Sequence, residues 1–148
     1  MRKAFVVTSA LVLVAVLAQF YFAGVGAFTR PATTDAWTAH RAGAVAIMAL
    51  ALLNTAVAAL ARAGGRIVAL AALPVGLVLV QYVLIAVSGA LGGSADERTG
   101  APLYVAALHA LNGLAVLGAA FAGLRNARRL AARAAGELAT EPQRASTP

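Results

Sequence analysis

The stretch AFVVTSALVLVAVLAQFYFAGVGAF, residues 4–28, decides the fold, because it is apolar over its whole length and carries no charged side chain. A helix needs about 20 such residues to cross a hydrocarbon core of about 30 Å. Comparable runs follow at residues 36–61, 67–91 and 102–124, separated by turn-forming segments rich in Gly, Pro, Ser and charge. The pattern predicts an all-α integral membrane protein in which residues 1–124 form one domain of four spans.

Composition supports lipid as the main solvent. The chain is 61% hydrophobic and 11% charged, whereas soluble domains carry about 25% charged residues. The formal net charge is +7. Its basic residues stand at the ends of apolar runs rather than among aromatic residues, so the charge indicates topology and no nucleic-acid partner is predicted. Cysteine is absent, which excludes disulfides, thiolate-bound metal and covalent haem attachment.

The distribution of Lys and Arg predicts the orientation. One side of the membrane would hold nine of these residues: Arg2, Lys3, Arg62, Arg66, Arg125, Arg128, Arg129, Arg133 and Arg144. The two loops on the other side hold only Arg30 and Arg98. Positive charge collects in the cytoplasm, so we expect both termini to be cytoplasmic in a multi-pass protein of a bacterial plasma membrane. A cleaved signal peptide is the alternative for the first run, but that run is too long for one.

Residues 125–148 form a basic tail. We expect it to continue as a helix on the anionic inner leaflet to about residue 138 and to be disordered over residues 141–148.

The chain reads as a repeated helical hairpin. Leu17-Ala18-Gln19-Phe20 of the first span matches Leu79-Val80-Gln81-Tyr82 of the third, and His40-Arg41-Ala42-Gly43 of the second matches the segment from His109 to Gly113 of the fourth. Both halves start on the same side, so a two-fold axis along the membrane normal would relate them. In an up-down bundle the second and fourth spans are diagonal, which predicts that the two histidines face each other.

Strongly polar residues inside spans are costly and usually face the bundle interior. Here they are Gln19, His40, Asn54, Gln81, His109 and Asn112, and all but Asn54 lie in or near the outer half. Two neutral imidazoles at one level suit axial ligation of a b-type haem iron, which makes His40 and His109 the candidate metal ligands.

Other residues complete this hypothesis. Gly43 and Gly113 would leave room for the porphyrin, and Arg41 would pair with a propionate or reach the outer headgroups. The candidate partners for the ring N–H groups are Gln19, Gln81 and Asn112. Such a protein would act in electron transfer or haem handling, with a membrane redox partner or as a homo-oligomer.

Two alternatives remain open. The histidines and amides would serve only as interhelical hydrogen bonds in a cofactor-free accessory or scaffold protein, or the polar cluster would be the site of a small-solute carrier. No Asp or Glu lies within a span and no nucleophile–base pair is visible, so enzymatic activity is not predicted.

The residues His40-Arg41-Ala42-Gly43 and Leu108-His109-Ala110-Leu111-Asn112 resemble one half of the haem A synthase family. That resemblance implies a four-helix bundle that binds haem through histidines of the second and fourth helices. The family carries an acidic residue shortly before the histidine of the second span, where this chain has Trp37-Thr38-Ala39, so its oxidation chemistry is not expected. The whole chain also resembles small uncharacterised four-span families of actinobacteria, which implies a fold and no activity.

Overall fold

The protein is a bundle of four long helices, described by a computed structural model for residues 1–31, 33–92 and 99–145. The helices are α1 (Arg2–Phe28), α2 (Thr38–Leu60), α3 (Gly65–Ala90) and α4 (Ala101–Ala145), and a short 3₁₀ helix, η1 (Thr34–Trp37), leads into α2. All four are long and apolar enough to cross a membrane. The predicted all-α, multi-pass membrane fold is therefore confirmed.

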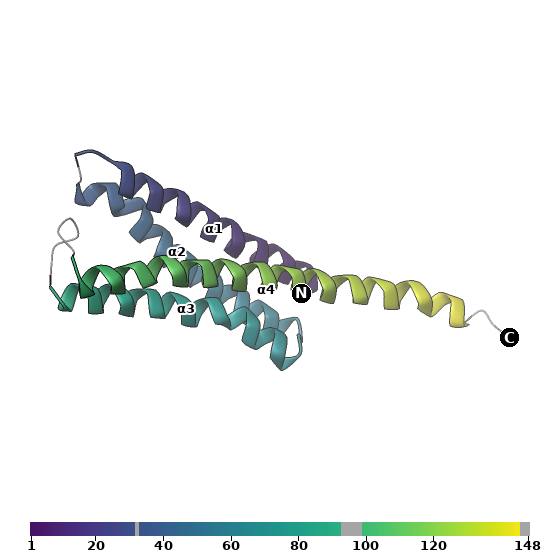
Figure 1. Cartoon of the computed structure of the whole chain (residues 1–148). Helices are drawn as coiled ribbons and strands as arrows, with labels where there is room; N and C mark the ends of the chain where they lie inside the picture. The colour runs from purple at the N-terminus through teal and green to yellow at the C-terminus, as the bar shows by residue number, and fades with distance from the viewer. Residues whose placement is uncertain (32, 93–98, 146–148) are drawn as a thin grey trace.

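The helices run up and down in ring order. Each packs on its two neighbours, α1 on α2 and α4, and α3 on α2 and α4. Helices α2 and α4 are the diagonal pair, as the sequence predicts, and the side chains of His40 and His109 meet between them. In Figure 1 the α1–α2 hairpin diverges from the α3–α4 hairpin toward the end where α1 and α3 finish and α2 and α4 begin, called here the outer end.

Local sequence explains where the helices end. Helix α1 stops at Phe28 because Pro31 disfavours helical backbone in the residue before it, and Thr29 closes the last turn by donating its hydroxyl to the Val25 carbonyl at 2.7 Å. Helix α2 ends with Arg62 in the left-handed region, at φ 53°. This conformation brings the Ala63 N–H to the Ala58 carbonyl at 3.1 Å, which satisfies an otherwise orphaned helix-end acceptor.

Two apolar clusters fill the interior. The inner cluster lies where the termini emerge and consists of Phe5, Val57, Ala58, Ala61, Ala63, Ala71 and Ala127. The middle cluster consists of Val12, Val16, Ile47, Val78, Val116 and Ala120. Large apolar side chains, such as Leu17 (51% exposed) and Phe121 (60%), point away from the bundle axis on all four helices, as a lipid-facing surface requires.

Hydroxyls and one amide connect neighbouring helices. Asn54 of α2, the polar span residue that lies away from the outer cluster, accepts hydrogen bonds from Thr8 Oγ1 at 2.8 Å and Ser9 Oγ at 3.0 Å on α1. Thr55 donates to the Ala71 carbonyl, and Ser88 to the Pro102 carbonyl. These bonds join α1 to α2, α2 to α3 and α3 to α4.

The C-terminal tail continues the last helix. Helix α4 runs without a break from the fourth span to Ala145 and extends beyond the bundle (Figure 1). The disorder expected for residues 141–148 stays a prediction, and residues 146–148 lie outside the described residues. Adding a residue to an existing helix requires no new nucleation, and the alanines of residues 131–139 favour propagation.

Candidate functional site

The outer third of the bundle interior is polar. The middle apolar cluster ends at Val16 on α1 and Val78 on α3, and one turn further out the same helix faces present Gln19 and Gln81. Residues three or four apart share a helix face, so these glutamines point into the bundle. On α2 and α4 the inward faces continue in the same way to the two histidines, and all four side chains are half-buried.

His40 and His109 meet across the bundle. Their ring centroids are 6.0 Å apart and the ring planes are inclined by 56°. The two residues come from the diagonal helices α2 and α4, so the structure brings together the pair that the repeat predicts. The rings face each other in the interior and not the lipid.

The Nδ1 atom of His40 is directed at the preceding helix of its own hairpin, where it lies 3.4 Å from the Gln19 carbonyl oxygen on α1. Nδ1 of His109 has no hydrogen-bond partner among the described residues. The sequence predicts side-chain amides as partners of the rings, whereas at His40 the structure supplies the backbone carbonyl of Gln19. Nε2 remains as the free nitrogen of His40.

Each glutamine side chain lies over a glycine. Gln19 donates its amide to the His40 carbonyl at 2.7 Å, and its Oε1 occupies the position that a Cβ at Gly43 would need. Gln81 Nε2 would lie 3.5 Å from a Cβ at Gly113. The Gln–His–Gly relation thus occurs once in each half of the molecule, which supports the predicted repeat.

Unpaired polar atoms are concentrated at this level. Among the described residues, three buried side-chain atoms lack a hydrogen-bond partner: Gln19 Oε1, Gln81 Oε1 and His109 Nδ1. Leaving a buried polar group unpaired costs about 1–3 kcal/mol, and such groups usually mark a place for water, an ion or a ligand. All three belong to the glutamine–histidine cluster.

Two aromatic residues, Trp37 and Phe20, also pack at this site, which the sequence does not predict. Trp37 reads as an outer-interface belt residue, but its indole packs inward on Gly26 of α1 and lies edge-on to His40 with ring centroids 5.7 Å apart. Its spacing of three residues from His40 was the available signal. Phe20 of α1 reaches Gly113 of α4, where its Cζ would lie 3.5 Å from an added Cβ.

Other predicted participants lie elsewhere. Asn112 donates to the Leu77 carbonyl of α3 at 2.8 Å and so joins α3 to α4. Arg41 is exposed and donates hydrogen bonds to the Thr34 carbonyl and the Thr38 hydroxyl near the start of α2. Arg98 falls outside the described residues.

The number of metal-binding side chains limits which metals the site could hold. In the part of the chain that the structure describes, no three or more His, Cys, Asp or Glu side chains group to hold a metal ion. Two imidazoles alone suit a metal that brings its other ligands with it, because bare transition-metal ions usually take four or more.

Comparison with known proteins gives a partial match to one family and no activity. The sequence model of a family of unknown function (DUF6220) matches residues 19–88, a range that includes Gln19, His40 and Gln81 and ends before α4. No curated protein and no solved structure matches the chain. The chain is thus similar, from the end of α1 through most of α3, to a family of unknown function.

Proposed function

We propose that the protein binds one b-type haem at the outer end of the bundle, with His40 and His109 as the two axial ligands. The observation that carries this proposal is the 6.0 Å separation of the two ring centroids. A metal–imidazole bond is about 2 Å long and the nitrogen lies about 1 Å from the ring centre, so two axial imidazoles place their centroids about 6 Å apart. The mutual tilt of the two rings is no obstacle, since axial ligands rotate freely about their own bonds.

The orientation of the rings supports the same proposal. Metal-bound histidines usually donate the other ring N–H to a carbonyl or carboxylate, which fixes the tautomer. The carbonyl of Gln19 is placed for this role at His40. With Nδ1 protonated, Nε2 is the nitrogen that would bind iron.

Glycines lie beside the two histidines in the bundle interior. The site lies beyond the apolar clusters, and glycines stand where larger residues would fill the interior. The side chains of Gln19, Gln81 and Phe20 lie over those glycines, so a porphyrin enters only when these three rotate away. Rotation frees the unpaired Oε1 of each glutamine to find a partner, and at Gln19 this offsets the loss of its amide bond to the His40 carbonyl.

The outer rim carries the charge that a haem's propionates need. Arg30 and Arg41 are exposed there and hydrogen-bond only to nearby carbonyls and a hydroxyl. Arginine pairs with carboxylates in a two-pronged geometry. We propose these two residues, with Arg98, as the propionate partners.

A single site in one leaflet suits electron transfer or haem handling with a partner, or a second copy, that carries electrons onward. We place the protein in a bacterial plasma membrane with both termini in the cytoplasm, as its arginine distribution favours. The resemblance of the two histidine motifs to one half of the haem A synthase family is part of this proposal.

The test is a haem titration of the protein purified in detergent, followed by the Soret absorbance. Wild type should saturate at one haem per chain, and the double variant H40Q/H109Q should show no saturable binding. Glutamine keeps a polar side chain in each helix, and circular dichroism with size-exclusion chromatography verifies that the variant is folded. Equal binding by wild type and the folded double variant would refute the assignment.

A cofactor-free scaffold is the second candidate. It is favoured by the Gln19 amide bond to the His40 carbonyl and by the Asn112 bond to Leu77, because both use polar groups to hold helices together. This alternative predicts that wild type takes up no haem and that H40Q/H109Q changes neither spectrum nor fold.

A further inference from the structure

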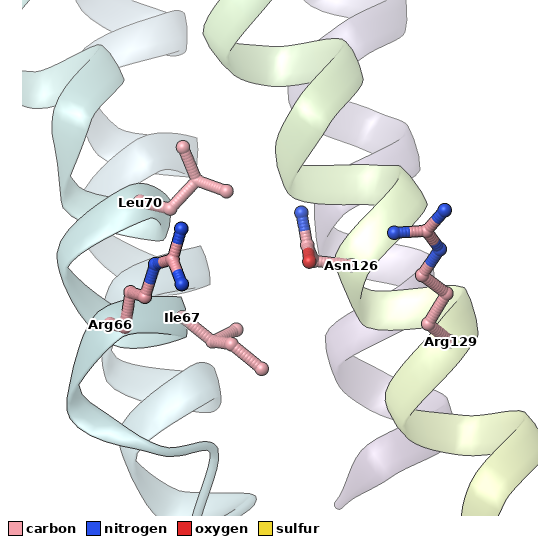
Figure 2. Close-up of a pocket in the computed structure, with 5 residues that line it drawn as sticks. All are labelled: Arg66, Ile67, Leu70, Asn126 and Arg129. Atoms are coloured by element: carbon pink, nitrogen blue, oxygen red, sulfur yellow. The ribbon is translucent and has the colours of Figure 1, made fainter.

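A second site lies at the inner end of the bundle, far from the histidines. A cleft of about 340 Å³ is lined by Arg66, Ile67, Leu70, Asn126 and Arg129. Figure 2 shows that it separates the start of α3 from α4, with Arg66 on one side, Arg129 on the other and the Asn126 amide projecting between them. None of these residues takes part in the proposed haem site.

The cleft concentrates unneutralised positive charge. Arg66 and Arg129 are exposed, and neither makes an ion pair or hydrogen bond with any residue that the structure describes. Of the five acidic residues in the sequence, Asp35 lies at the opposite end of the bundle, Asp96 and Glu97 fall outside the described residues, and the other two follow Arg129 by eight or more positions along α4. Further arginines, at positions 62, 125, 128 and 133, surround the same end.

The remaining lining is apolar or neutral. Ile67 and Leu70 project from α3 into the gap (Figure 2). Asn126 donates its amide to the Ala122 carbonyl of its own helix at 2.8 Å, so its Oδ1 is the atom left to accept a hydrogen bond from a ligand. The cleft therefore offers two guanidinium groups, one acceptor and a hydrocarbon wall.

We propose that this cleft binds the head group of an anionic phospholipid from the cytoplasmic leaflet. Guanidinium groups bind phosphate through paired hydrogen bonds, and basic pockets between transmembrane helices on the cytoplasmic side are suited to anionic lipid head groups. A glycerol hydroxyl of the head group would donate to Asn126 Oδ1. The apolar wall of Ile67 and Leu70 favours a lipid over free phosphate, because it would contact the first carbons of an acyl chain.

The experiment is native mass spectrometry of the full chain, released from nanodiscs that contain phosphatidylcholine with a minor fraction of phosphatidylglycerol. Wild type should retain phosphatidylglycerol and not phosphatidylcholine. The variant R66Q/R129Q should lose about tenfold or more of the retained lipid, since each basic group near the surface contributes substantially to lipid affinity. The matched control R62Q/R128Q removes the same charge from the same end but leaves the cleft lining intact, so it should retain lipid as wild type does.

Three results would overturn the proposal. Equal loss in both double variants would show diffuse charge attraction without a site. Equal retention of phosphatidylcholine would show that the charge is irrelevant. Displacement of the retained lipid by millimolar inorganic phosphate would identify a soluble phosphate as the ligand. The readout involves no haem, so it is independent of the function proposed above.

Discussion

At the scale of single residues, the outer site depends on where glycine leaves space. Gly26 lets the Trp37 ring lie against α1, and Gly43 lets the Gln19 side chain lie against α2. Trp37 then stands next to His40, and Gln19 holds the His40 carbonyl. The position of one imidazole thus depends on two side chains that a methyl group would displace.

The replacement G26A should lower the free energy of unfolding by about 1–3 kcal/mol, because an added Cβ would lie 2.6 Å from Trp37 Cδ2 and overpacking costs about that much. The control is G24A, two residues earlier on α1, where an added Cβ meets nothing within 4 Å. It should be neutral or stabilising by up to about 1 kcal/mol, the helix-propensity gain of alanine. Unfolding in mixed detergent micelles measures both. Equal effects of the two changes would contradict the packing described here.

A replacement at Gly113 tests haem binding separately from folding. An added Cβ there makes only ordinary contacts, the shortest at 3.5 Å, so in the haem-free protein G113A should be neutral or stabilising by up to about 1 kcal/mol. Under the proposed function the methyl group would project toward the porphyrin and weaken haem binding at least about fivefold, the lower end expected for overpacking. G118A, on the same helix with nothing within 4 Å, should bind haem as wild type does. A haem titration of the three proteins decides the matter, and unchanged affinity in G113A would count against a porphyrin at this face.

At the scale of helices, the bundle is held by a small number of polar contacts between neighbours. Asn54 is 3% exposed and accepts from two hydroxyls of α1. In a membrane such bonds stabilise helix association by about 0.6 kcal/mol on average and by up to about 1.7 kcal/mol. This contact joins α1 to α2 in the inner half of their hairpin, whereas Gln19 and His40 lie in the outer half.

The replacement N54A should therefore destabilise the protein by about 1–2 kcal/mol, because the Ser9 hydroxyl loses its acceptor and a small cavity opens. The matched control N126A removes an amide that hydrogen-bonds only to the Ala122 carbonyl of its own helix, and its effect should stay below about 0.5 kcal/mol. Thermal unfolding in detergent compares the two. A larger loss in N126A than in N54A would show that the interhelical bond does not stabilise the bundle.

Sequence periodicity predicts the helices well but not every detail of the site. The spans at residues 36–61 and 67–91 differ by only a few residues from the helices observed, because apolar length and flanking charge define them. The meeting of His40 and His109 is also predicted, since the repeat fixes their helices and their level. The inward turn of Trp37 and the reach of Phe20 are not, because they depend on which glycine faces which ring across a helix pair, and no local pattern encodes that.

At the scale of the whole molecule, the two ends differ in chemistry. The outer end is a polar interior with paired imidazoles, while the inner end has an apolar core and an arginine-rich rim around the cleft. The sequence predicts this polarity from the distribution of Lys and Arg. It predicts that the last helix continues past the fourth span but not where that helix ends, because a helix leaving the bundle has no apolar stripe that marks its end.

The orientation in the membrane can be tested with introduced cysteines, because the sequence contains none of its own. The variant T33C, between α1 and η1, should react with a membrane-impermeant maleimide in intact cells. The variant G64C, between α2 and α3, should react only after the membrane is permeabilised, because the positive-inside pattern puts this turn in the cytoplasm. The opposite labelling pattern would invert the topology and place the histidines near the cytoplasmic face.

The most direct test of the central claim is the electron paramagnetic resonance spectrum of the ferric, haem-loaded protein. Two imidazoles whose centroids lie 6.0 Å apart should give a single low-spin species with bis-imidazole ligation. Either single variant, H40Q or H109Q, should convert it to a high-spin species or abolish it. A high-spin spectrum in the wild type, or a low-spin spectrum that survives both single replacements, would contradict the account.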